Sequence, residues 1–216
     1  MKIGMIDGSP KVKDSCTKEL LLELNRLITE GNELIKLSIN SNRMDTTIYD
    51  KLYGCDAIVI AMPLYMDGVP SHLLCFMEEM QRFLRQREAK KIFVYTIINN
   101  GFYEGRQTDL ANQIVENWCE KVGLPWGMGI GVGSGSMVMS VKSVPLGRGP
   151  KKNLGIALNQ LAKRIANQES AENIYVNLNF PRFLYILAAH QGWRYAVKQN
   201  GLKKKDLYRQ CKSSSK

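Results

Sequence analysis

The feature that most constrains this chain is its alternation of short apolar runs with stretches in which apolar residues recur at helical spacing. The runs MKIGMID, DAIVIAMP and KIFVYTIIN (residues 1–7, 56–63 and 91–99) carry few polar side chains, as strands buried on both faces do. NELIKLSI and the glycine-rich PWGMGIGVGSG supply a second and a fifth strand. Strand and helix then alternate five times, which predicts a three-layer, doubly wound α/β fold with a five-stranded parallel sheet.

The intervening stretches have helical start and stop signals. Residues 15–30 place Leu20, Leu24 and Ile28 on one face; Ser15 or Thr17 can cap the helix start, and a glycine follows its end. Further helices are expected over 71–87, 107–122 and 154–166, with a short helical turn near residues 49–55. No internal repeat or low-complexity linker interrupts the alternation, so one domain holds all five strands.

Composition excludes several classes. The 216 residues are 44% apolar and 23% charged, enough to bury a core, and no apolar run approaches the roughly 20 residues that span a bilayer. Five cysteines, an odd number without a CxxC pair, argue against a disulfide scaffold and predict no metal site. A soluble, cytoplasmic protein without a membrane span is expected.

The net charge of +10 belongs mainly to the C-terminal end. Residues 181–216 hold nine basic side chains and one acid, which leaves +2 for residues 1–180. We therefore expect a domain over 1–180 and a helical, basic extension over 181–216. The aromatic stretch after Pro181 is consistent with a docking helix, a dimer arm or a membrane-surface helix; packing on its own domain or on a sister subunit is favoured. No nucleic-acid module signature is present, so no nucleic-acid partner is expected.

Chemistry is expected at the carboxyl edge of the sheet, where ligands of open α/β sheets bind. The loop after the first strand, GSPKVKDSCT (residues 8–17), offers three hydroxyls, two lysines and the amides of a helix N-terminus. A phosphate needs this set of donors. A plain capped turn would have a similar sequence, so this loop alone leaves both interpretations open.

Two further loops reach the same edge. Residues 62–71 hold Pro63, Tyr65 and Pro70, and residues 99–106 hold Phe102 and Tyr103 between glycines. A phosphate-bearing planar heteroaromatic ring fits the three loops. Neither G-x-G-x-x-G after the first strand nor a P-loop is present. The run GIGVGSGS at the fifth strand is interpreted as close packing or a flat loop rather than a pyrophosphate cradle. Without a G-x-S-x-G elbow, the two histidines are interpreted as structural or surface groups.

GSPKVKDSCT, DAIVIAMPLYMDGVPSHLLCFMEEM and INNGFYEG together resemble the three FMN-binding loops of the flavodoxin-like NAD(P)H-dependent FMN reductase family. The resemblance covers about residues 1–170 and implies strand order 2-1-3-4-5. It implies contacts to the FMN phosphate from Ser9, Lys11, Ser15, Cys16 and Thr17, and to the ring from Pro63, Leu64, Tyr65, Met66, Asn100, Gly101 and Phe102. Cys16 departs from the family, which often has a small polar residue there.

The resemblance implies an FMN-dependent oxidoreductase that passes hydride from NAD(P)H to flavin N5 and on to a small acceptor, with no catalytic side chain. The acceptor (a quinone, a flavin, a nitro compound or similar) stays open. Tyr65, Tyr103 and Arg106 are the expected substrate contacts, and a homodimer is expected. The alternative is a non-enzymatic flavin-binding electron carrier that serves a partner protein. The acidic character and T-x-T-G-x-T loop of true flavodoxins are absent.

Overall fold

The computed structural model describes residues 1–41 and 45–209. The chain divides into two compact units, Met1–Asn179 and Phe180–Lys216. The first unit holds the whole sheet and the helices that cover it. The second consists of helix α7 (Arg182–Gln199) and the 3-10 helix η3 (Lys204–Tyr208), followed by residues 210–216 outside the described range.

The sheet is parallel throughout, in the order β2-β1-β3-β4-β5-β6. Its strands are β1 (Lys2–Asp7), β2 (Glu33–Ser38), β3 (Ala57–Pro63), β4 (Phe93–Asn99), β5 (Trp126–Val132) and β6 (Ile174–Val176). Every residue of β3 and β4 is buried, as the uninterrupted apolar runs predict. The doubly wound α/β fold with strand order 2-1-3-4-5 is confirmed.

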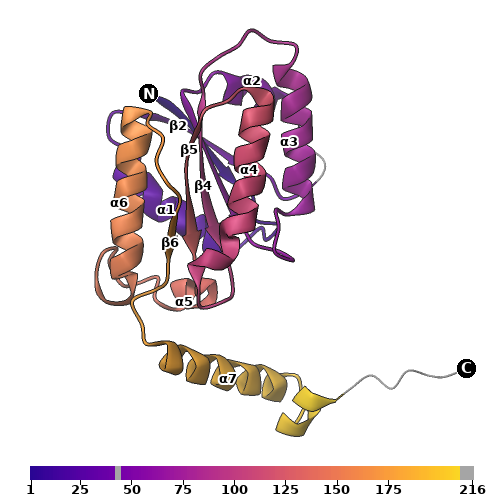
Figure 1. Cartoon of the computed structure of the whole chain (residues 1–216). Helices are drawn as coiled ribbons and strands as arrows, with labels where there is room; N and C mark the ends of the chain where they lie inside the picture. Colours follow the sequence, from indigo (N-terminus) through magenta and orange to yellow (C-terminus); the bar gives the residue numbers. More distant parts are fainter. Residues whose placement is uncertain (42–44, 210–216) are drawn as a thin grey trace, which may run out of the picture. The chain divides into compact units, whose positions relative to one another are not determined.

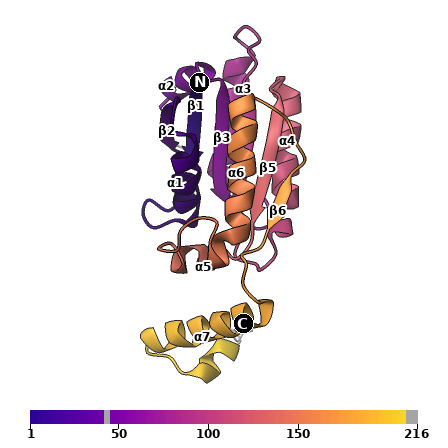
Figure 2. The same ribbon diagram turned by 90° about the vertical axis from the view of Figure 1, so that its left-hand side faces the viewer.

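Helices cover both faces of this sheet (Figure 1). Figure 2 shows α1 (Cys16–Ile28) and α6 (Lys152–Asn167) in front of the strands, while the helices on the other face are α2 (Thr47–Tyr53), α3 (Ser71–Leu84) and α4 (Asp109–Val122). Each face has its own core. Leu20, Leu24 and Leu158 pack in one, and Phe76 and Val115 pack in the other.

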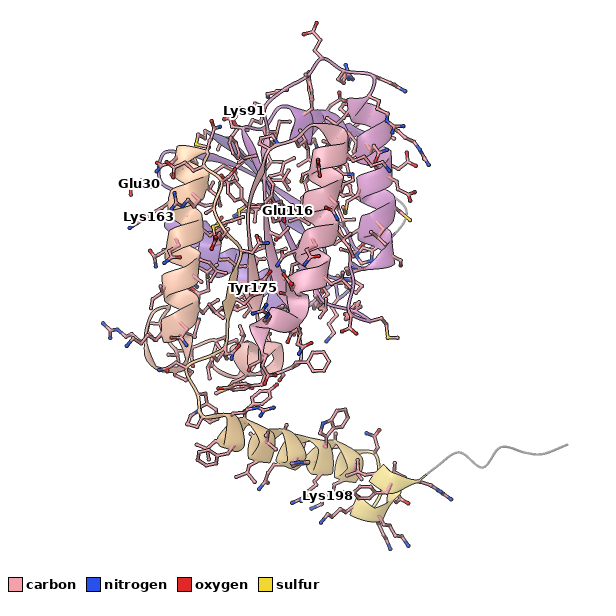
Figure 3. All side chains as sticks on the ribbon, in the orientation of Figure 1. Glu30, Lys91, Glu116, Lys163, Tyr175 and Lys198 are labelled. Carbon is pink, nitrogen blue, oxygen red and sulfur yellow. The ribbon has the colours of Figure 1, made fainter. Side chains whose placement is uncertain are left out.

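The sixth strand corrects the expected count of five. β6 has only three half-buried residues, too few for a periodic apolar pattern. Asparagine side chains hold both of its ends in place: Asn173 Oδ1 accepts from Gly129 N–H at 2.7 Å, and Asn177 Oδ1 accepts from Gly105 N–H at 2.8 Å. Tyr175 of β6 lies beside α4 (Figure 3), where its hydroxyl donates to Asp109, and burial raises its pKa to about 12.

The glycines of β5 serve close packing, as the sequence predicts. A Cβ at Gly129 would lie 2.3 Å from Asn112 Oδ1, and one at Gly131 would lie 2.1 Å from Thr108 Oγ1. The absence of side chains at these positions lets the 3-10 helix η1 (Gly105–Thr108) and α4 approach the strand. This close approach sets the position of the loop that follows β4.

Helix α7 differs from the other long helices because none of its 18 residues is buried. Phe183, Leu187, Trp193 and Tyr195 are each more than half exposed. In the described ranges, no helix is long and apolar enough to cross a membrane.

Candidate functional site

The loops that carry the predicted site meet at one edge of the sheet. β1 and β4 are the two neighbours of β3 and run parallel to it, so their carboxyl ends lie together at the lower end of the sheet in Figure 1. The loop after β1 is joined to β3 by Gly8 N–H, which donates to Ala61 O at 2.8 Å. Topology alone therefore brings residues 8–17, 62–71 and 99–106 to a common edge.

The first loop is folded by its own side chains. Asp7 Oδ1 accepts from Ser9 N–H at 3.0 Å, Ser9 Oγ accepts from Lys11 N–H at 3.2 Å, and Ser15 Oγ caps α1 by accepting from Lys18 N–H at 3.1 Å. Of the two possible caps, the structure selects Ser15. Burial raises the pKa of Asp7, while the Ser9 bond and the charge of Lys18 oppose the shift. The result is a tight turn that runs into the positive end of a 13-residue helix.

Two residues outside the predicted set fix this loop. Thr17 Oγ1 donates to Asn99 Oδ1 at 2.9 Å, and Asn99 O in turn accepts from Leu64 N–H at 2.7 Å, so Asn99 joins all three loops. His72, which is buried at the start of α3, contacts Gly8 O through Nε2 at 3.0 Å. Its role is thus structural, as the sequence suggests, and it holds the first residue of the loop.

The second loop is a tight hairpin. Tyr65 and Gly68 exchange backbone hydrogen bonds of 3.2 and 3.0 Å, and the two residues between them, Met66 and Asp67, have φ of 49° and 58°. Positive φ at both central positions defines a type I′ turn, which usually contains Asn or Gly. Met66 is fully exposed and Tyr65 is 44% exposed. The turn therefore projects an aromatic ring and an apolar chain from strained backbone.

The third loop contains a buried acceptor without a donor. Asn100 is 3% exposed, and its Nδ2 donates to Glu104 O at 3.0 Å, but its Oδ1 has no hydrogen-bond partner among the described residues. Phe102, two residues later, is 54% exposed. An unsatisfied buried oxygen is costly unless a ligand or water supplies a donor.

A fourth loop, which the sequence reasoning missed, supports the third. Ser134 N–H donates to Phe102 O, Gly135 N–H donates to Asn100 O at 2.8 Å, and Ser134 has φ of 60°. A Cβ at Gly135 would come within 2.8 Å of Asn100 O. The only sequence signal was the run of glycines, which predicts close packing without saying what packs there.

The predicted residues differ in exposure. The buried ones are Ser9, Ser15, Thr17, Pro63 and Asn100, the half-buried ones Cys16, Leu64 and Tyr103, and the exposed ones Lys11, Tyr65, Met66, Gly101, Phe102 and Arg106. The thiol of Cys16 packs against the α1–α6 core, and burial raises its pKa to about 12. Its backbone amide, and not its thiol, is the group that a ligand could use.

This arrangement suits a phosphorylated, planar heteroaromatic ligand. The first loop offers hydroxyls and amides at a helix N-terminus, the exposed rings of Tyr65 and Phe102 offer stacking surfaces, and Asn100 Oδ1 offers an acceptor for a ring N–H. FMN carries all three complementary groups, so the residues present fit it. Among the described residues, no three His, Cys, Asp or Glu side chains gather as a metal site would require.

The fold and this edge define a protein with the flavodoxin-like architecture. Among solved structures that share it, an NADH:FMN oxidoreductase in its apo form is 15% identical, with a TM-score of 0.60 over 84% of this chain and 96% of that one. An NADPH-quinone reductase from P. pentosaceus is 13% identical, with a TM-score of 0.57 over 75% and 98%. A flavodoxin-type, WrbA-like protein from Agrobacterium tumefaciens is 14% identical, with a TM-score of 0.54 over 78% and 98%.

These structures come from the group of proteins that the three loop sequences resemble, and at such identities the likeness establishes the fold. No family model matches the chain, and no curated protein is similar to it in sequence.

Proposed function

We propose that the protein is an FMN-dependent oxidoreductase that uses NAD(P)H as the electron donor and reduces a small molecule. The observation that carries the proposal is the edge at which Ser9, Ser15, Tyr65, Asn100 and Phe102 lie on neighbouring loops. The structurally similar proteins support it, since they include an NADH:FMN oxidoreductase and an NADPH-quinone reductase.

Bound FMN would supply the hydride- and electron-transfer chemistry between NAD(P)H and a second acceptor. The chain's own residues would bind FMN and orient it. The loop of Ser9, Lys11, Ser15, Cys16 and Thr17 would hold the phosphate through hydroxyls and amides. The backbone of Pro63, Leu64, Tyr65 and Met66 would line the ring, with Asn100, Gly101 and Phe102 at its pyrimidine side. Tyr65, Tyr103 and Arg106 would contact the incoming substrate.

The first test is the cofactor itself. Purified protein is expected to be yellow, with flavin absorption, and the pigment released by denaturation is expected to be FMN. The single phosphate-type loop and the absence of a second pyrophosphate motif in the sequence are the reasons to expect FMN. Release of FAD in stoichiometric amount would contradict the proposal.

The second test addresses the site. Asn100→Leu removes the unpaired buried acceptor and should weaken FMN binding about tenfold, measured by quenching of flavin fluorescence during titration. Asn159→Leu, on the exposed side of α6, serves as the matched control and should bind FMN like the unaltered chain. Equal affinity in both variants would place the flavin elsewhere.

The third test separates an enzyme from a carrier. Steady-state oxidation of NADH and NADPH should be measured with a quinone, free flavin and a nitro compound as acceptors. Turnover with at least one acceptor is expected of a reductase. A protein that binds FMN and is reduced only by a partner protein would be the alternative electron carrier.

We also propose that the domain spans 1–180, that 181–216 forms an extension, and that the protein works as a cytoplasmic homodimer. The exposed apolar side chains of α7 support the dimer because a second copy could cover them. The free cysteines, Cys16, Cys55, Cys75 and Cys119, are compatible with a reducing compartment. A monomer in sedimentation at micromolar concentration would contradict the dimer.

A further inference from the structure

A groove lies at the lateral edge of the sheet formed by β2, between this strand and α1. It encloses about 440 Å³, within the range of about 300–1,000 Å³ for small-molecule sites. It exists because β2 lies at the end of the sheet, while α1 packs against β1, β3 and β4. We call it the edge groove; its walls include Met5, Asp7, Lys18, Leu22, Asn25 and Lys36.

The residues of the edge groove follow the periods of their elements. Lys18, Leu22 and Asn25 lie about one turn apart and share one side of α1. Met5 and Asp7 share one face of β1, where they pair in register with Lys36 and Ser38 of β2. The groove therefore has an apolar floor with polar groups along both sides.

The edge groove is lined by two lysines, Lys18 and Lys36, and by one carboxylate, Asp7, so one positive charge is not balanced. Asp7 already accepts from Ser9 N–H and interacts with the charge of Lys18. Lys36 is exposed on β2, and among the described residues it has no ion pair or hydrogen-bond acceptor. The uncompensated ammonium of Lys36 would attract an anionic group to a ligand's outer end.

A second polar group of the groove lacks a partner. Asn25 Oδ1 is buried and accepts no hydrogen bond from the described residues. Asn25 lines the groove and is half-buried, and a half-turn of its amide about the Cβ–Cγ bond would exchange this oxygen with Nδ2. A ligand that donates a hydrogen bond there would satisfy an acceptor that the fold leaves unpaired.

We propose that the edge groove binds a small organic monoanion with an apolar ring body, a carboxylate held by Lys36 and one ring N–H or O–H donor held by Asn25. Met5 and Leu22 supply the apolar contact. The edge groove borders the loop of residues 8–17 at Val12, but Lys36 and Asn25 belong to none of the three loops of the candidate flavin site. The proposal therefore does not rest on the flavin function.

Indole-3-acetate is a suitable probe because it combines the three required groups. Two analogues each lack one of them: indole-3-ethanol has no carboxylate, and 1-naphthaleneacetate has no ring N–H. Titration of the full-length protein, followed by backbone amide shifts in NMR, should give a Kd near 1 mM or below for indole-3-acetate, about the value expected for a ligand of its size. Each analogue should bind at least about fivefold more weakly.

Two variants assign the contacts. Lys36→Met should weaken indole-3-acetate about tenfold and leave indole-3-ethanol unchanged, while Asn25→Leu should weaken indole-3-acetate and leave 1-naphthaleneacetate unchanged. Lys163 lies on α6 (Figure 3) and lines a separate cavity. Lys163→Met is therefore the control and should change neither affinity. Because each variant is compared on two ligands, misfolding would reveal itself by weakening both.

Three results would overturn the proposal. The first is no binding of indole-3-acetate at several times the expected Kd, and the second is amide shifts confined to other parts of the chain. The third is equal affinity of the unaltered protein and Lys36→Met for the acid. Since none of these measurements uses flavin or turnover, their failure is distinct from failure of the proposed oxidoreductase.

Discussion

α6 and α7 have similar lengths, 16 and 18 residues, and similar apolar content, but they bury different amounts of it. In α6, Leu154, Leu158, Leu161 and Ile165 recur at helical spacing and are buried. In α7, the apolar segment FLYILAA (residues 183–189) surrounds the whole first half of the helix, and none of its residues is buried. A helix with apolar residues on one side can bury all of them against one face of a sheet. A helix with apolar residues on all sides can bury them only if it has packing partners on every side.

The two helices also differ in how their ends are held. Lys151, directly before α6, forms a buried ion pair with Glu23 of α1, and Tyr95 Oη donates to Arg164 O and Glu169 O at the other end. α7 begins after Pro181 without a side-chain cap. In α6, polar anchors at both ends thus accompany the apolar stripe. The following predictions test this difference, from the largest expected effect to the smallest.

Removing the Lys151 anchor should have the largest effect. Lys151→Met leaves the carboxylate of Glu23 buried with only Arg26 beside it, and it should lower the free energy of unfolding by about 3–5 kcal/mol. Lys152→Met, at the exposed neighbouring position, should change it by less than about 0.5 kcal/mol. Urea unfolding measures the free energy of unfolding of both variants. Equal stability of the two would contradict a stabilising role of the Lys151–Glu23 ion pair.

A leucine from each helix tests the apolar difference directly. Leu158→Ala creates a cavity in the core and should cost about 2–5 kcal/mol. Leu187→Ala, at a position that is 57% exposed, should change the unfolding of Met1–Asn179 by less than about 0.5 kcal/mol while weakening dimerisation. If Leu187→Ala lowers the free energy of unfolding as much as Leu158→Ala does, the two helices belong to one cooperative unit.

The Tyr95 anchor should give α6 a dependence on alkaline pH. Burial raises the pKa of Tyr95 to about 12, against about 10 in the unfolded chain. Its stabilising contribution is therefore complete below pH 10 and is lost as pH rises through 12. The difference in unfolding free energy between the unaltered protein and Tyr95→Phe should fall by about 2 kcal/mol over that interval. A constant difference would show that the hydroxyl does not titrate as described.

Truncation after Asn200 should have the smallest effect. The chain beyond α7 holds Lys203–Lys205 and has no buried side chain among its described residues, so its loss should leave flavin content and NAD(P)H oxidation nearly unchanged. The SSSK terminus (residues 213–216), also expected to be solvated, lies outside the described range. A loss of turnover with NADPH but not with NADH would instead assign these lysines to the 2′-phosphate.

The fold was largely predictable because its central strands, β3 and β4, are almost entirely apolar. β3 and β4 have no polar face, and such runs between helical stretches indicate a parallel sheet. β6 was missed because three half-buried residues make no pattern, and its ends depend on Asn173 and Asn177 bonding to residues far away in sequence. The short helix α5 (Gly135–Ser140) was missed because it starts inside a glycine-rich run.

The parts of the candidate site that strand order places could be predicted from the sequence. The parts that depend on side-chain contacts between distant residues could not. Parallel neighbours bring the loops after β1, β3 and β4 to one edge whatever their sequence. Asn99 and His72, by contrast, bond to residues 82 and 64 positions away, and no local pattern signals either bond. The unpaired oxygen of Asn100 became visible only once its surroundings were known.

The buried pair of Glu23 and Lys151 has an evolutionary consequence. The two residues are separated by 128 positions in sequence, yet neither side chain reaches solvent. A change at position 23 alone leaves the Lys151 ammonium buried without its partner, and a change at position 151 alone leaves the buried Glu23 carboxylate with only Arg26. A joint change to well-packed apolar residues removes both buried charges together. Among descendants of this sequence, positions 23 and 151 should therefore covary, and single replacements should be rare intermediates.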